Sequence, residues 1–206
     1  VIKAGLAYVP PKKESPQIAG GWRNAPPLAA FTCARITEMT QLRKEDIRDE
    51  GGIPVVRITP DAGSVKTGDY RDVPLHPQLV ELGFLDFVKA LPAGPIFHRS
   101  KGDKTLIGAR TASGRVSNWL QSLGVIPEGV SPNHGWRHRL KTIGQEEGIS
   151  DRVIDAIQGH AGRTAGDDYG DVTIKARAAV NWPPFRPDSR HNAGGLSDDQ
   201  TISCGA

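Results

Sequence analysis

Residues 55–75 read VVRITPDAGSVKTGDYRDVPL, and this stretch decides the fold class. Over 55–59, β-branched residues alternate between two faces, which is the period-two pattern of a strand. The segment 61–69 is rich in glycine and aspartate, and an extended pattern resumes over 70–75. The stretch therefore predicts a β-hairpin with a long polar turn.

Apolar residues on both sides of this hairpin recur at helical spacing. Proline in the first turn is typical of the expected helices that begin near Pro26 and Pro77. A short strand is predicted at Ile96 and Phe97. We expect helices over Pro26–Arg43, Pro77–Val88, Val116–Leu123, Trp136–Glu147, Ser150–Ile157 and Val172–Val180. The pattern predicts an α+β fold, mainly α, in which a helical domain carries a small antiparallel β-sheet.

The 206 residues suffice for one sizeable core. We expect residues 1–20 to be a linker or truncated lead-in, 21–182 to form the domain, and 183–206 to be a flexible tail. The chain begins with Val1 rather than methionine, which indicates a piece of a longer protein. No internal repeat is visible.

The composition favours an ordinary globular protein. Hydrophobic residues make up 37% of the chain and charged residues 24%, and no apolar run is long enough to cross a bilayer. The first residues lack a signal peptide pattern. Cys33 and Cys204 do not form a disulfide framework of the secreted type, so a cytoplasmic setting is expected. A net charge of +3 permits a nucleic acid partner without requiring one.

Arg35 falls in the middle of the apolar stripe of the first expected helix, among Leu28, Phe31 and Met39. A guanidinium keeps its proton, so a buried arginine must meet an anion. Glu38, three residues along, is one candidate partner. The pattern leaves two interpretations open: a structural pair of Arg35 with Glu38, or an arginine that binds phosphate.

Residues 132–139 read PNHGWRHR and place two arginines and two histidines around the start of a helix. Helix N-termini favour anions, and arginine forks match phosphate oxygens. A solvated basic face is the other interpretation of this cluster. His134 and His138 also have the i, i+4 spacing of zinc ligands, but Gly135 stands where an H-E-x-x-H motif requires glutamate.

Three further residues gain meaning from their order in the chain. Lys66 alone is an ordinary turn lysine, His160 follows an apolar helix pattern, and Tyr169 alone is more often a packing residue. Together with Arg35-x-x-Glu38 and His134-x-x-Arg137, however, they form a series with matching intervals. In this order the chain resembles the tyrosine recombinase (phage integrase) family over about residues 25 to 182, the catalytic domain of that family. Flanking text such as LRKEDI at 42–47 and DVPL at 72–75 also resembles integrases.

The resemblance implies an integrase-like DNA breaking-rejoining fold and a site-specific recombinase. Tyr169 would attack the scissile phosphate of double-stranded DNA and leave a 3′-phosphotyrosyl link, without metal or nucleotide cofactor. Arg35 and Arg137 would hold the phosphate oxygens, and Lys66 would protonate the leaving oxygen. The remaining roles fall to His134 for proton transfer with the tyrosine, His160 for a hydrogen bond to phosphate, Glu38 for holding Arg35, and His138 as a supporting residue. The family acts as a homotetramer on DNA.

The sequence also departs from the family. Cys33 stands where the family commonly has glycine, the stretch before the first expected helix is short, and Asp167, Asp168 and Asp171 flank the tyrosine. Three alternatives therefore remain: a catalytically inactive DNA-binding remnant of a prophage integrase, a topoisomerase of the same tyrosine mechanism, and a zinc hydrolase that uses His134, His138 and His160.

Overall fold

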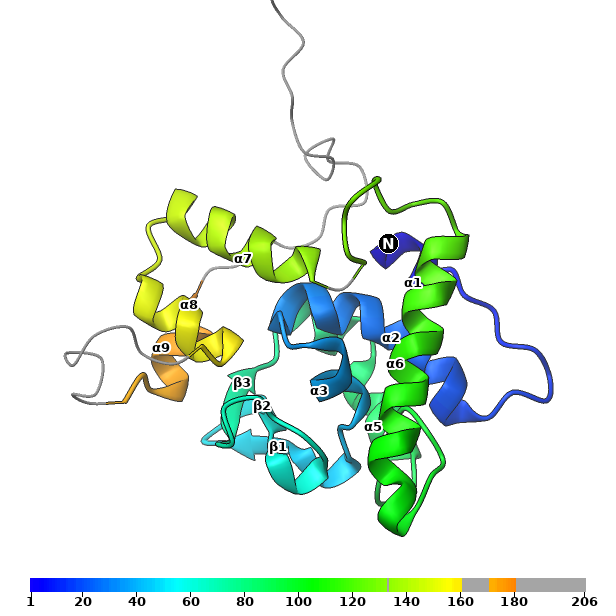
Figure 1. Cartoon of the computed structure of the whole chain (residues 1–206). Helices are drawn as coiled ribbons and strands as arrows, with labels where there is room; N and C mark the ends of the chain where they lie inside the picture. The colour runs from blue at the N-terminus through cyan, green and yellow to red at the C-terminus, as the bar shows by residue number, and fades with distance from the viewer. Residues whose placement is uncertain (133, 161–170, 181–206) are drawn as a thin grey trace, which may run out of the picture.

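The computed structural model describes residues 1–132, 134–160 and 171–180. Helices predominate, and one three-stranded antiparallel sheet lies against them (Figure 1). The coarse prediction of a mainly helical α+β fold is thereby confirmed. Within these residues, no helix combines the length and the apolar character that a membrane span requires.

The sheet contains the predicted hairpin and one strand that the sequence analysis missed. Strand β2 (Ile53–Ile58) pairs with β3 (Arg71–Pro74) as expected, and β1 (Ile47–Glu50) adds to the other side of β2. Gly51 and Gly52 join β1 to β2 with φ angles of +66° and +86°, which favour glycine. The strand expected at Ile96 and Phe97 is wrong, because these residues are buried in irregular chain.

Residues 1–20, expected to be a linker, instead contain helix α1 (Ile2–Leu6) and the first turns of α2 (Pro16–Thr32). Pro26 lies inside α2 rather than in its first turn, and it has no N–H to donate to the carbonyl of Trp22. Gly5 packs against this place: a Cβ added there would lie 3.1 Å from the Trp22 oxygen and from Pro26 Cγ. Helix α1 therefore covers backbone that the prolines leave without helical partners.

The single helix predicted over Pro26–Arg43 is wrong, because α2 ends and a second helix, α3 (Ile36–Thr40), begins. Cys33 adopts a left-handed conformation with φ +50° and ends α2. Thr32 contributes to the break, since its hydroxyl donates to the Leu28 carbonyl and accepts from the Ala34 N–H. Arg35 consequently stands at the N-cap of α3 and not on a core stripe.

The remaining helices mostly follow the predictions. The helix expected from Pro77 is divided at Gly83 (φ +82°) into α4 (Pro77–Glu81) and α5 (Phe84–Ala90). The other four expected helices are present, although the third begins at Thr105, well before Val116, and the last is shorter than predicted. Their bounds, with those of the intervening short turns, are η1 (Lys44–Asp46), η2 (Pro60–Ala62), η3 (Gly102–Lys104), α6 (Thr105–Ser122), α7 (Gly135–Glu146), α8 (Asp151–Gln158) and α9 (Ile174–Ala178).

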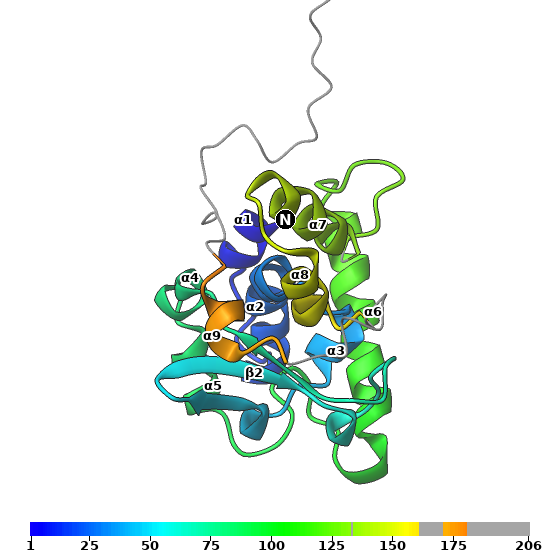
Figure 2. The same ribbon diagram turned by 90° about the vertical axis from the view of Figure 1, so that its left-hand side faces the viewer.

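The main core lies between α2, α3 and the sheet, and it extends under α5, α7 and α8 (Figure 2). Its largest fully buried side chains include Leu28, Met39, Phe84 and Phe97. Helix α9 rests on β3, where Arg177 donates to the Asp72 carbonyl at 2.6 Å. A smaller cluster of Ala25, Val116 and Leu120 joins α2 to α6. These contacts bring α3, α7 and the end of α8 to one side of the core.

Two adjacent glycines of α2 test this packing. A Cβ at Gly20 would lie 2.1 Å from Phe87 Cζ, whereas nothing lies within 4 Å of a Cβ at Gly21. We predict that Gly20→Ala lowers the free energy of unfolding by about 1–3 kcal/mol through overpacking. The control Gly21→Ala should raise it by about 0.5–1 kcal/mol, because alanine is the better helix former. Urea unfolding measures both changes, and equal effects would contradict the α2–α5 contact.

Candidate active site

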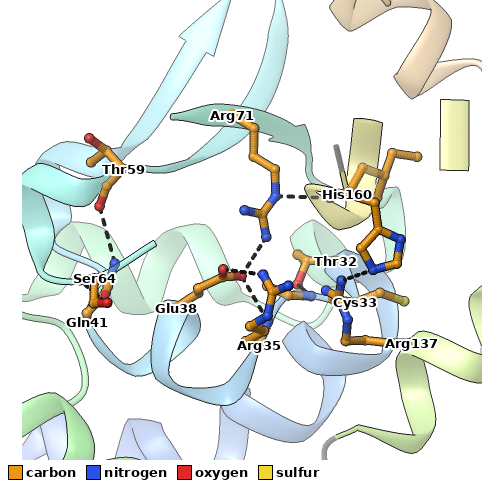
Figure 3. A network of polar contacts seen from close by, with 12 residues as sticks. Thr32, Cys33, Arg35, Glu38, Gln41, Thr59, Ser64, Arg71, Arg137 and His160 are labelled. Carbon is orange, nitrogen blue, oxygen red and sulfur yellow. Dashed lines mark hydrogen bonds and ion pairs between the residues drawn. The ribbon is translucent and has the colours of Figure 1, made fainter. Parts of the chain in front are cut away.

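A buried carboxylate, that of Glu38, is the centre of a network of cations (Figure 3). Its Oε1 accepts a hydrogen bond from Arg35 Nη1 at 2.8 Å, and its Oε2 accepts one from the Arg35 N–H at 3.0 Å. The same Oε2 accepts from Arg71 Nη2 at 2.6 Å. One residue of α3 therefore fixes its own N-cap and holds a side chain of the sheet.

Opposing effects act on the ionisation of Glu38. Burial alone would raise its pKa, but the charges and hydrogen bonds of Arg71 and Arg35 outweigh burial and hold the pKa below the usual 4.5. Glu38 therefore stays ionised at neutral pH. The pairing of Arg35 with Glu38 that the sequence suggested is confirmed as a contact.

Arg137, on the first turn of α7, reaches the same place from the other side. It is only 4% exposed, and its Nη1 donates to the Cys33 carbonyl at 2.6 Å. Its Nη2 lies 2.7 Å from His160 Nε2. Within the described residues, no carboxylate forms an ion pair with Arg137. Burial, with the charge of Arg35, lowers the pKa of Arg137 to about 10, so its cationic form is poorly compensated in the free protein.

His160 follows α8 and connects Arg137 to a second ion pair. Its Nδ1 lies 3.0 Å from Asp155 Oδ1, and Asp155 also pairs with Lys141 Nζ at 2.8 Å. A guanidinium can only donate, so Nε2 of His160 accepts from Arg137 and Nδ1 carries the proton toward Asp155. Burial lowers the pKa of His160 further than Asp155 raises it, which favours this neutral form.

Arg71 is the member of the network that sequence reasoning missed. It is 7% exposed, its Nε donates to the Ile157 carbonyl at 3.2 Å, and its buried Nη1 has no hydrogen-bond partner among the described residues. Gly159 is needed beside it: its φ is +67°, and an added Cβ would lie 2.6 Å from Arg71 Nη1. The signal in the sequence was a charged residue in phase with Val73 on the inward face of β3.

The other expected site residues lie at different distances from this network. His134 is exposed at the N-cap of α7, with its ring 5.1 Å from that of His138. Partial burial, followed by the charges of His138, Arg137, Arg35 and His160, lowers the pKa of His134. Lys66 is exposed in the loop between β2 and β3, and among the described residues no hydrogen bond or ion pair joins it to the network. Tyr169, with Asp167 and Asp168, lies outside the described residues.

The zinc alternative lacks a ligand set in the described part of the chain. His134 and His138 are neighbours, but no group of three histidine, cysteine, aspartate or glutamate side chains there could hold a metal ion. His160 instead contacts Arg137 and Asp155.

Comparison with protein-family models, curated proteins and solved structures finds no match for this chain.

The arrangement can bind an anion. Three guanidinium groups, from Arg35, Arg71 and Arg137, lie around one carboxylate, so the cluster carries two uncompensated positive charges, and the neutral His160 adds none. Charged groups in a partly dry site interact more strongly than at an open surface. The site therefore favours a compact anion with several oxygens, such as a phosphodiester.

We predict that Glu38→Gln reduces the free energy of unfolding by about 3–5 kcal/mol near neutral pH, because two arginines lose their buried partner. The pKa of Glu38 is depressed, so its stabilisation is complete above 4.5 and is lost as the pH falls through the lower folded-state pKa. The difference in the free energy of unfolding between wild type and Glu38→Gln should therefore shrink in acid, at about pH 3. Urea unfolding at both pH values measures it.

The exposed Glu81 of α4 supplies a matched control, because among the described residues it forms no ion pair. Glu81→Gln should change the stability by less than about 0.5 kcal/mol at either pH. If the difference between wild type and Glu38→Gln were the same at both pH values, the assigned ionisation of Glu38 would be wrong.

Proposed function

We propose that this chain is a site-specific DNA recombinase that cleaves and rejoins DNA through a 3′-phosphotyrosyl bond to Tyr169. The observation that carries the proposal is the buried guanidinium of Arg137, which lies beside Arg35 and has no carboxylate partner among the described residues. A buried unpaired charge costs several kcal/mol, and an anion that enters the site would offset this cost.

A DNA phosphodiester fits the chemistry of these groups. The planar forks of Arg35 and Arg137 can each bind two phosphate oxygens and stabilise the charge that develops as the phosphorus is attacked. Arg71 reinforces the positive field from behind Glu38. Because guanidinium groups supply this stabilisation, the reaction we propose requires no metal ion or nucleotide.

The proposed reaction is a pair of transesterifications. The Tyr169 oxygen attacks the phosphorus, the bond from phosphorus to the 5′-oxygen breaks, and His134 takes the phenol proton. Lys66 gives a proton to the 5′-oxygen, and the reverse sequence rejoins the strands without external energy. This role for Lys66 requires the loop between β2 and β3 to carry its ammonium to the DNA.

The contacts of His160 refine the role that the resemblance implied. Its Nε2 already accepts a hydrogen bond from Arg137 in the free protein, and its Nδ1 is held by Asp155. We therefore assign His160 to orienting Arg137, with Asp155 and Lys141 behind it. The proposed partners are double-stranded DNA and three further copies of this chain on paired sites, in a cytoplasmic setting.

The exposed position of Lys66 favours one alternative function, a DNA-binding domain that no longer cleaves. Without a general acid, the cations would still bind the DNA backbone. The alternative predicts binding without any covalent adduct, so the same experiment distinguishes the two functions.

We predict that the chain forms a covalent adduct with DNA at Tyr169. Nicked duplexes of random sequence trap such an adduct because the short cleaved strand diffuses away. Denaturing gels detect the adduct, and mass spectrometry maps the modified residue. Tyr169→Phe should abolish the adduct and keep DNA binding, whereas Tyr70→Phe, which changes an exposed tyrosine of the hairpin loop, should retain both. An adduct that survives in Tyr169→Phe would assign the nucleophile to another residue.

We further predict that Arg137→Lys slows adduct formation about a hundred- to thousandfold, because an ammonium cannot replace the planar fork. DNA binding should weaken much less. The control Arg139→Lys alters an exposed arginine two residues along α7 and should cleave at nearly the wild-type rate. The rates are measured on a duplex selected from the trapped pool. Thermal unfolding verifies that both variants are folded. Equal rates for the two variants would remove Arg137 from the mechanism.

A further inference from the structure

A second cavity, separate from the Glu38 network, opens between α2, α6 and the loop that precedes α6. Its volume is about 620 Å³, which lies in the range of small-molecule sites. None of the residues that line it belongs to the cluster of Arg35, Glu38, Arg71, Arg137 and His160. The cavity therefore needs an explanation of its own.

The interior of this cavity is apolar and partly aromatic. Ile18, Trp22, Phe97 and Val116 line it, and Ile107 at its edge is 63% exposed. The indole N–H of Trp22 donates to Glu14 at 3.0 Å, so the hydrogen-bonding capacity of Trp22 is already satisfied. An apolar ring that entered the cavity would remove the exposed apolar surface of Ile107 and Trp22 from water at little polar cost.

The imidazole of His98, a buried polar group, also lines the cavity. His98 is 7% exposed, and its Nδ1 accepts from the Ser100 N–H at 3.2 Å. Burial lowers the pKa of His98, which favours the neutral ring with its proton on Nε2. Among the described residues, this Nε2–H has no hydrogen-bond acceptor, so it is a donor available to a ligand.

The position of His98 is fixed before any ligand arrives. Gly108 of α6 lies so close to the loop that an added Cβ would be 2.4 Å from Ser100 Oγ and 2.6 Å from His98 Nδ1. The loop is thus seated directly on the helix backbone. A donor that is already in place loses little entropy on binding.

The lining is positively charged. Arg99, Lys104 and Arg115 line the cavity, and all three are exposed and without an ion pair in the described part of the chain. No aspartate or glutamate appears among the described lining residues. Helix α6 also begins at Thr105, next to Lys104, so the positive end of its dipole lies at the same opening.

We propose that this cavity binds a small organic anion. Its apolar ring occupies the space beside Trp22 and Phe97, and its carboxylate or phosphate contacts His98 and the cationic rim formed by Arg99, Lys104 and Arg115. The apolar interior without the cations would accept a neutral ring equally well. The rim without the interior would bind only a diffuse cloud of counterions. The combination selects a ring that carries a negative charge.

Naphthoate, naphthyl phosphate and neutral naphthamide test this proposal, because they share a ring and differ in the attached group. Amide NMR spectra of the nitrogen-15-labelled chain should shift over residues 97–116 on addition of either anion. Naphthamide should bind about tenfold more weakly, since it lacks the charge-assisted hydrogen bonds. The stronger of the two anions identifies the preferred acid group.

Matched variants assign the effect to the cavity. Arg115→Gln should weaken naphthoate binding, whereas Arg110→Gln changes an exposed arginine of the same helix that does not line the cavity and should leave it unchanged. Ala112→Leu, which fills the space, should block all three compounds while thermal unfolding verifies the fold. Equal affinity for naphthoate and naphthamide would overturn the proposal. A spectrum that naphthoate leaves unchanged would also overturn it. If Arg115→Gln then weakened DNA binding, the cationic rim would be assigned to DNA instead.

Discussion

The carboxylate of Glu38 is the constraint on which the structure depends. It accepts hydrogen bonds from the backbone and side chain of Arg35 and from the guanidinium of Arg71, so it joins α3 to the sheet. Arg71 in turn holds the end of α8 through the Ile157 carbonyl. Without this one negative charge, the cations around it would repel one another in a partly dry interior, and the segments that carry them would separate.

The sequence was most informative where one periodicity covered a whole element. The β2–β3 hairpin, helices α7 and α8 and the C-terminal part of α6 follow from alternation and helical spacing. The pattern failed at Cys33, because apolar residues on two successive helices can fit one helical wheel by coincidence. It failed again at residues 1–20. Helix α1 is stabilised by packing against the proline-interrupted backbone of α2, and the local sequence does not show this contact.

The candidate site was predictable in its parts and not in its connections. Arg35, Glu38, Arg137 and His160 do come together, from segments more than a hundred residues apart. Arg71 was hidden inside a strand pattern: its phase with Val73 marked an inward charge, but its partner Glu38 lies 33 residues away in another element. The orientation of His160 toward Arg137 depends on Asp155 and Lys141, a relation that spacing along one helix cannot reveal.

Cys33 gives this architecture a chemical reporter. Its thiol is buried between α2 and α7, where Sγ lies 3.4 Å from the Trp136 carbonyl, and burial raises its pKa to about 12. Thiolates, not thiols, react with alkylating reagents. The sulfur is therefore inert while α2 and α7 stay together and becomes reactive when they part, so the kinetics of its alkylation record how often the Arg137 end of the network opens to water.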